Sequence, residues 1–250
     1  MQVDWTRFCE VIHASNNVVL TSHIRPDCDA LGSCLGMAGL LESLGKKVRI
    51  VCGQEVPGNL AFIDPENRIK CIGKDITAEE FADADLHIIL DTSAWIQLGD
   101  MAEVIKNSTY KKIIFDHHEG EDDIDAELFK NTTAEAVGRM IVEAAEHLGV
   151  EMTPEIAQPV LAALATDTGW FRFGSVNPGT FRATARLLEA GANQVSSMAN
   201  CTSEKPLAEF DFAVLFWRES KRSSMVAWRT RSSCLTTTRR QVLIQLTLKI

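Results

Sequence analysis

Four short polar segments of the sequence gather carboxylates and imidazoles, the side chains that most often bind divalent cations outside thiolate sites. In chain order they contain His23, Asp27 and Asp29; Asp91 and Ser93; Asp116, His117 and His118; and Asp167. The seven cysteines contain no C-x-x-C pair. Oxygen and nitrogen ligands, rather than thiolates, therefore define the candidate chemistry.

The adjacent histidines His117 and His118 are the strongest single signal, because packing rarely calls for two imidazoles after an apolar run. Neighbouring residues in an extended or turn conformation point apart, so the two rings should have different roles. A structural alternative exists for each segment. The histidines suit an exposed turn before the acidic run 121–123, Asp29 suits a helix cap, and Asp91 suits a polar turn after a strand.

Together the segments offer six candidate metal ligands: His23, Asp27, Asp29, Asp91, His117 and Asp167. Carboxylates mixed with imidazole suit Mn²⁺, with Mg²⁺ or Co²⁺ as alternatives. Six ligands exceed the needs of one tetrahedral zinc site. They are enough for two cations about 3.5–4 Å apart that share a carboxylate, an arrangement used for phosphoester hydrolysis. The sequence therefore predicts a two-metal hydrolytic site.

The elements that must position these residues alternate between strands and helices. Short apolar runs predict strands at 18–23, 47–52, 86–91 and 112–116. Helical spacing predicts helices at about 5–15, 30–44, 96–107, 134–149, 154–166 and 178–190. This order predicts an α/β fold, a doubly wound and mainly parallel sheet with helices on both faces. Ligands bind beyond the carboxyl ends of such strands, where His23, Asp91 and Asp116 lie.

The formal charge of −9 is unevenly distributed along the 250 residues. Residues 218–250 contain eight Lys or Arg and one acidic residue, which leaves 17 basic and 33 acidic residues, a charge of −16, in residues 1–217. An acidic body disfavours long duplex DNA and suits a site that holds cations, so short or small phosphorylated substrates are expected. The scattered cysteines, the absence of a signal-peptide pattern and the absence of a 20-residue apolar run favour a cytoplasmic protein without a membrane segment.

The ordered motifs resemble those of the DHH phosphoesterase superfamily. The matching residues are His23-x-x-x-Asp27-x-Asp29, Asp91, Asp116-His117-His118 and Asp167, across about residues 18–175. The family includes RecJ-like exonucleases, nanoRNase/pAp phosphatases of the NrnA type, cyclic-dinucleotide phosphodiesterases, and family II pyrophosphatases and exopolyphosphatases. Residues 23–33 and 131–135 look most like the nanoRNase/pAp phosphatase branch.

The resemblance implies a role for each residue. His23 and Asp27 would hold one cation, Asp29, His117 and Asp167 would hold the other, and Asp91 would bridge both. His118 would face the scissile phosphate, and Asp116 would orient the histidine turn. The candidate substrate contacts are Arg25, Ser93 and Thr133. The implied substrates are short oligoribonucleotides, 3′-phosphoadenosine 5′-phosphate, or both.

Three parts of the chain are expected: a catalytic α/β domain at 1–190, a linker helix region at 191–217 and a basic, atypical tail at 218–250. Members of this branch carry a second domain of roughly a hundred residues with a Gly-rich, His-containing motif, a common domain size. Here the last glycine is Gly191, so the tail resembles a remnant or frameshifted start of that domain. Cyclic-dinucleotide hydrolysis, polyphosphate hydrolysis and a low-activity metal- and nucleotide-binding remnant therefore stay open as alternatives, and a homodimer is considered.

Overall fold

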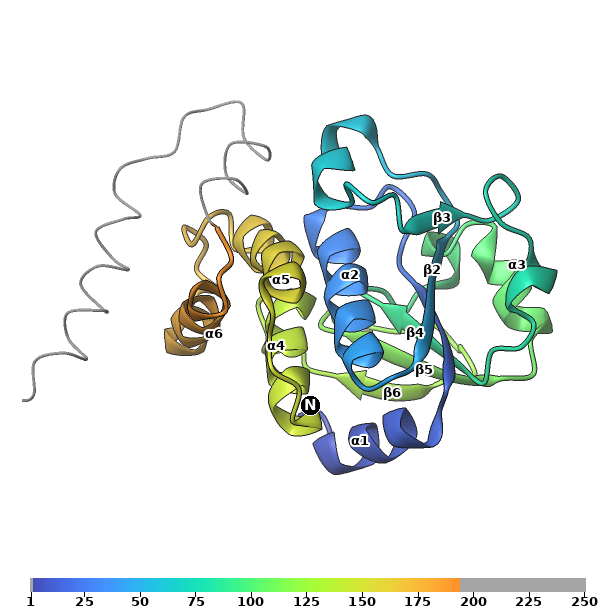
Figure 1. Cartoon of the computed structure of the whole chain (residues 1–250), viewed down its shortest axis with the longest axis horizontal. Helices are drawn as coiled ribbons and strands as arrows, with labels where there is room; N and C mark the ends of the chain where they lie inside the picture. Colours follow the sequence, from blue (N-terminus) through green and yellow to red (C-terminus); the bar gives the residue numbers. More distant parts are fainter. Residues whose placement is uncertain (1, 194–250) are drawn as a thin grey trace, which may run out of the picture. The chain divides into compact units, whose positions relative to one another are not determined.

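Six parallel strands form the sheet at the centre of residues 2–193, the part of the chain that the computed structural model describes (Figure 1). The strand order is β3-β2-β1-β4-β5-β6, and every neighbouring pair is parallel. The strands are β1 Asn17–Thr21, β2 Lys47–Cys52, β3 Ile69–Cys71, β4 Leu86–Leu90, β5 Lys111–Asp116 and β6 Glu127–Lys130. The predicted α/β class is confirmed. Most of the predicted linker helix region and the whole basic tail lie outside the described residues.

The central strands are buried on both faces, which explains their near-continuous apolar sequences. Leu20, Ile88 and Phe115 point into one core, whereas Val19 and Ile89 point into the other. The sequence does not predict the two edge strands, β3 and β6. They are three and four residues long and contain charged residues, so neither shows an apolar run.

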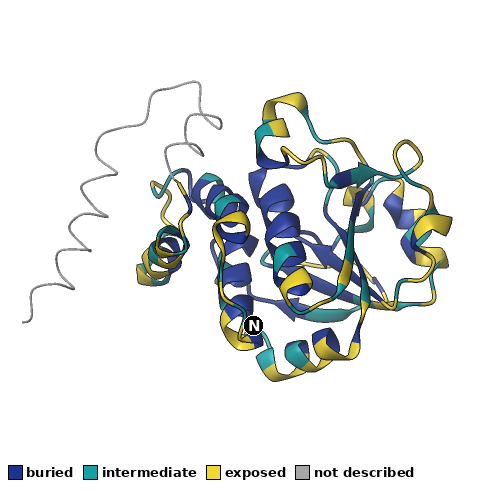
Figure 2. Cartoon of the chain, viewed as in Figure 1, coloured by how far each residue is buried: buried dark blue, intermediate teal, exposed yellow. Residues whose placement is uncertain are grey.

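Helices cover the two faces of the sheet unequally (Figures 1 and 2). The larger core lies beneath α1 Trp5–Ala14, α2 Cys28–Ser43, α4 Val137–Leu148 and α5 Pro154–Asp167, with α6 Pro178–Glu189 packed on α5. The smaller core lies beneath α3 Met101–Asn107 and the 3₁₀ helix η2 Ala78–Phe81. None of the helices in residues 2–193 combines the length and apolar character that crossing a bilayer requires.

Helices α2 and α5 pack unusually closely, and this brings one end of each to the site. A Cβ atom on Gly32 would lie 2.3 Å from the Pro159 carbonyl oxygen, and one on Gly36 would lie 2.3 Å from Val160 Cγ2. Only glycine permits this approach. The helices run antiparallel, so the start of α2 lies near the end of α5.

The predicted helix at 96–107 is wrong in its first half. The structure has a short 3₁₀ helix, η3 Trp95–Gln97, followed by a break and then α3. Gly99 causes the break, because its φ of 54° is left-handed and a Cβ there would lie 2.5 Å from Ile24 Cγ2.

Candidate metal centre

All four polar segments meet at the carboxyl end of the sheet. The strand order reverses between β1 and β4, which is the position where doubly wound sheets open a ligand crevice. His23 follows β1, Asp91 follows β4, and Asp116 ends β5. The close packing of α2 and α5 adds Asp29 and Asp167.

The side chains form three overlapping groups, each with ligand atoms within 4.8 Å of one another. The groups are His23, Asp27 and Asp91; Asp29, His117 and Asp167; and Asp91, His117 and His118. All six residues predicted as metal ligands thus lie together. Asp91 and His117 each belong to two groups, so the groups form one continuous centre.

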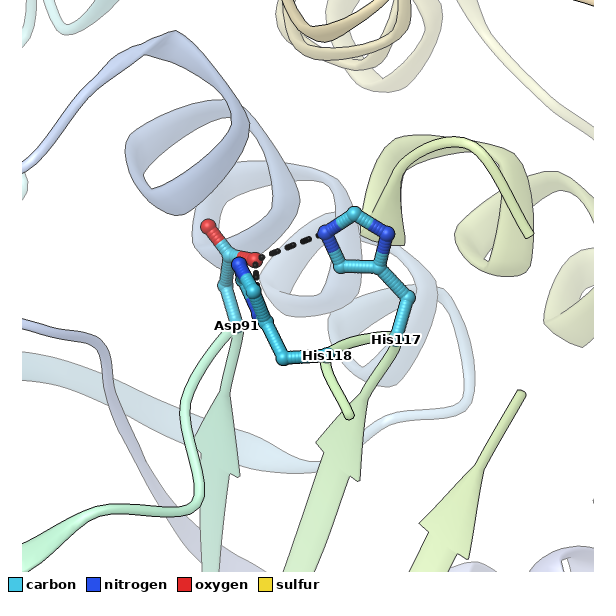
Figure 3. A group of neighbouring side chains, drawn as sticks. All are labelled: Asp91, His117 and His118. Carbon is cyan, nitrogen blue, oxygen red and sulfur yellow. Dashed lines mark ion pairs between the residues drawn. The ribbon is translucent and has the colours of Figure 1, made fainter. Parts of the chain in front are cut away.

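Asp91 belongs to two of the groups, and Figure 3 shows its carboxylate facing both His117 and His118. Its Oδ2 lies 3.4 Å from His23 Nε2, and its Oδ1 lies 3.6 Å from His117 Nε2. Its two carboxylate oxygens therefore face two different groups. Its φ is 61°, a left-handed conformation that aspartate tolerates better than most residues. The side chain is buried, and Oδ1 accepts no hydrogen bond from the described residues.

The two ligand histidines are oriented by backbone carbonyls. His117 Nδ1 lies 3.1 Å from the Ala134 oxygen, and His23 Nδ1 lies 2.9 Å from the Ile24 oxygen. A carbonyl oxygen only accepts, so each Nδ1 must carry the hydrogen. Nε2 of each ring faces the carboxylates, and in the neutral tautomer this nitrogen carries the lone pair that metal ligation requires.

The alternative in which Asp29 caps the helix is wrong, because the cap is Asp27. Asp27 is the N-cap of α2 and accepts a 3.0 Å hydrogen bond from the Ala30 N–H. Asp29 is buried in the first turn and accepts hydrogen bonds from the Val137 and Gly138 N–H groups, both at 2.8 Å. The start of α4 therefore fixes the Asp29 carboxylate.

Three of the ligand carboxylates, those of Asp29, Asp91 and Asp167, have raised pKa values. Burial, followed by the charge of Asp167, raises the pKa of Asp29 to about 6. Burial and the charge of Asp27 raise the pKa of Asp167 to about 6. Burial and the neighbouring carboxylates also raise the pKa of Asp91 well above its usual range. The crowded carboxylates, the unpartnered Asp91 Oδ1 and the two imidazole lone pairs fit a pair of hard divalent cations.

Asp116 behaves differently from the other carboxylates. Its Oδ1 accepts hydrogen bonds from His118 Nδ1 at 2.9 Å and from the His118 backbone N–H at 3.2 Å, and Lys130 Nζ lies 3.2 Å from Oδ2. Burial opposes ionisation, but these bonds and the Lys130 charge outweigh it and lower the pKa of Asp116 to about 2. The Asp116 bond in turn raises the pKa of the half-exposed His118 to about 8.

The three candidate substrate contacts have different surroundings. Arg25 and Thr133 are exposed. The Ser93 hydroxyl is instead buried, donating to the Gly120 carbonyl at 3.0 Å and accepting from Lys130 Nζ at 2.9 Å. Lys130 was missed because it lies on the unpredicted strand β6.

A left-handed turn follows Asp167 directly. Gly169, Trp170 and Phe171 have φ values of 57°, 57° and 62°, which bulky side chains rarely adopt. The turn is held by the Trp170 N–H bond to Ala165 and by Thr168, which accepts from the Phe173 N–H. Phe173 is 57% exposed next to this turn. No apolar periodicity marks such a turn in the sequence.

The chain is similar in sequence to curated relatives over most of its length. A bifunctional oligoribonuclease and PAP phosphatase NrnA from Thermus thermophilus is 32% identical over 178 residues, covering 70% of this chain and 50% of the relative. The protein of the same name from Bacillus subtilis is 28% identical over 189 residues, covering 74% and 56%. The chain thus spans about half the length of these relatives.

Among solved structures, an exopolyphosphatase-related protein from Bacteroides fragilis matches with a TM-score of 0.70 and 23% identity, covering 86% of this chain and 64% of that chain. At this identity the likeness concerns the fold. The family model for the N-terminal domain of the DHH family matches residues 17–164, more than half of the chain. That range includes every motif segment except Asp167, which lies just beyond it, and the chain belongs to the DHH family.

Proposed function

We propose that this chain is a metal-dependent phosphoesterase that hydrolyses short oligoribonucleotides, 3′-phosphoadenosine 5′-phosphate, or both. The observation that carries the proposal is the position of the Asp91 carboxylate. Its Oδ2 faces His23 in one ligand group, and its Oδ1 faces His117 in another. A bridging carboxylate between two cations is the arrangement that phosphoester hydrolysis uses repeatedly.

In this proposal His23 and Asp27 hold one cation, Asp29, His117 and Asp167 hold the other, and Asp91 contacts both. Mn²⁺ is the first choice, and Mg²⁺ and Co²⁺ are alternatives, because the ligands mix carboxylate with imidazole. When bound, the cations would supply charge neutralisation at the phosphate and a more acidic attacking water.

His118 is proposed to contact the substrate. Its Nδ1 is held by Asp116, so Nε2 is the ring nitrogen left to donate a hydrogen bond to a phosphoryl oxygen. A protonated ring at this position would stabilise negative charge that develops in the transition state. Arg25 and Thr133 are exposed and remain candidate contacts for the rest of the substrate.

The substrate class rests on the relatives. Both NrnA relatives carry oligoribonuclease and PAP phosphatase in their names, and they are 32% and 28% identical to this chain over their aligned lengths. The charge of −16 in residues 1–217 supports short rather than long polyanionic substrates.

The test is a metal and substrate screen on the whole chain. Protein stripped with a chelator is reloaded with Mn²⁺, Mg²⁺ or Co²⁺ and given an RNA dinucleotide, 3′-phosphoadenosine 5′-phosphate, a cyclic dinucleotide or polyphosphate. We expect metal-dependent hydrolysis of the first two. Turnover of only the cyclic dinucleotide or polyphosphate would replace the substrate assignment, and metal binding with no turnover at all would indicate a binding remnant.

The substitution His118→Ala tests the assigned chemistry. Loss of a group that stabilises transition-state charge should lower kcat by about 10²–10³-fold while both metals still bind. His13→Ala is the matched control, because His13 is exposed at the end of α1. Equal activities of the two variants would remove His118 from the mechanism.

A further inference from the structure

A lysine ammonium group is buried beside the proposed metal centre. Lys130 ends the edge strand β6 and is only 4% exposed. The parallel register pairs it with Asp116 at the end of β5, so the two side chains leave the sheet on the same face. Burying a cation costs free energy unless other groups compensate, so its contacts identify what it stabilises.

The Lys130 ammonium joins two loops that carry site residues. Nζ donates to the Gly120 carbonyl oxygen at 2.6 Å and to Ser93 Oγ at 2.9 Å. Ser93 follows Asp91 by two residues, and Gly120 follows His118 by two residues. The same hydroxyl of Ser93 also donates to Gly120, which closes the link between the loops.

The third strong contact of Lys130 completes the surroundings of Asp116. Asp116 uses Oδ1 for both hydrogen bonds from His118, whereas Oδ2 accepts no hydrogen bond from the described residues and lies 3.2 Å from Lys130 Nζ. Asp116 is fully buried, so the ion pair with Lys130 is what compensates this oxygen. Without it, Oδ2 would be buried with no compensating charge, and only the two hydrogen bonds from His118 would hold the carboxylate in its orientation.

We propose that Lys130 is a positioning residue, which acts through Asp116 to hold the His118 ring in one orientation towards the substrate phosphate. This inference rests on the proposed function, because it assigns His118 to the phosphate. It adds a side chain that contacts neither cations nor substrate. It also accounts for Asp116 lying outside the metal groups, since both of its oxygens are already occupied by His118 and Lys130.

The first test compares Lys130→Met with Lys130→Arg. Methionine keeps the apolar stem and removes the charge, and arginine restores the charge. We expect K130M to lower kcat for the RNA dinucleotide by about 10- to 100-fold, the usual effect of losing a group that orients an active-site side chain. KM and Mn²⁺ affinity should stay within about threefold, and K130R should recover part of the loss. Lys112→Met is the matched control, because Lys112 is a half-buried sheet lysine that donates to the Ser108 carbonyl.

A double-substitution cycle separates positioning from general weakening. If Lys130 acts through His118, adding K130M to H118A should change kcat by less than about twofold, because the two residues form one unit. A further 10-fold or greater loss in the double variant would overturn the proposal. So would wild-type kcat in K130M.

A spectroscopic test does not require turnover. In ¹³C–¹H spectra of the metal-free chain, the His118 ring should give one signal set in wild type and K130R, and broadened or multiple signals in K130M. The His13 ring should be unchanged. If K130M does not fold, Lys130→Gln takes its place, because it keeps an N–H donor for Gly120 without charge. One sharp, unshifted His118 signal in the uncharged variant would reject the positioning role, whereas a wild-type chain without hydrolysis would reject only the proposed function.

Discussion

Asp91 and Asp116 both lie at the carboxyl ends of buried neighbouring strands, yet their surroundings are opposite. Asp91 Oδ1 accepts no hydrogen bond from the described residues, and its pKa is raised. Asp116 has the ion pair with Lys130 and two hydrogen bonds from His118, and its pKa is lowered to about 2. The chain pairs Asp116 with a buried lysine, whereas the groups within ion-pair range of Asp91 are the imidazoles of His23, His117 and His118. We infer that Asp91 is the carboxylate available to a metal and that Asp116 has a structural role beside it.

The largest effect should follow from Asp91→Asn. Losing the shared carboxylate should lower turnover more than about a thousandfold and weaken Mn²⁺ binding, because both ligand groups depend on it. Calorimetric titration with Mn²⁺ and the dinucleotide assay measure the two effects. Unchanged binding of two Mn²⁺ ions by D91N would contradict the inference that Asp91 is the carboxylate available to a metal.

Asp116→Asn should lower the stability of the fold and leave metal binding largely unchanged. It removes the buried carboxylate nearest to the Lys130 ammonium and leaves only the exposed Glu121 carboxylate, 3.8 Å away. Breaking such a buried pair typically costs about 3–5 kcal/mol of folding free energy. Mn²⁺ affinity of the protein that remains folded should change little. Denaturant unfolding checks the first expectation and calorimetry the second; a D116N chain as stable as wild type would show that Lys130 does not depend on Asp116.

Without metal, D91N should be more stable than wild type. Removing a buried charge whose Oδ1 has no hydrogen bond should raise the unfolding free energy at pH 8 by about 1–3 kcal/mol. Because the pKa of Asp91 is raised on folding, the folded wild-type chain binds more protons than the unfolded chain, and its stability falls as pH rises. The advantage of D91N should therefore shrink as pH falls. Urea unfolding of both chains in chelator, between pH 5 and pH 8, measures the difference in their unfolding free energies. If the extra stability of D91N grew towards acid pH, the pKa of Asp91 would not be raised in the folded chain.

Ser93→Ala should have the smallest effect. It removes one hydrogen-bond partner of Lys130 but leaves Gly120 and Asp116 in place, so we expect a loss of about 1 kcal/mol in stability and kcat within a few-fold of wild type. An increase of KM beyond about tenfold would instead identify Ser93 as a substrate contact. Steady-state kinetics on the dinucleotide distinguishes the two.

The sequence predicted the strands that are buried on both faces and the helices with clear spacing, because periodicity reports burial directly. It did not predict β3 or β6, whose short edge strands carry charges, and Lys130 was missed for the same reason. The break at Gly99 depends on contact with Ile24, 75 positions earlier in the chain. Such tertiary contacts leave no local pattern.

The candidate site was predicted as a set of residues but not as a set of contacts. The types and order of His23, Asp91 and His117 indicated metal ligation, and the structure brings them together. The sequence could not assign the helix cap to Asp27 and the α4 contacts to Asp29, because both are acidic residues at one helix start. Only the relative placement of α2 and α4 distinguishes them.

The glycine contacts between α2 and α5 have a consequence for which ion the protein prefers. Asp29 lies at the start of α2 and Asp167 at the end of α5, so the separation of these helix axes sets the gap between two carboxylates of one ligand group. Mg²⁺ demands shorter and more regular coordination than larger divalent ions. We therefore expect residues such as Gly36, which belong to none of the ligand groups, to influence which ionic radius these carboxylates accommodate. Bulkier residues along this contact would favour a larger ion with the same ligands.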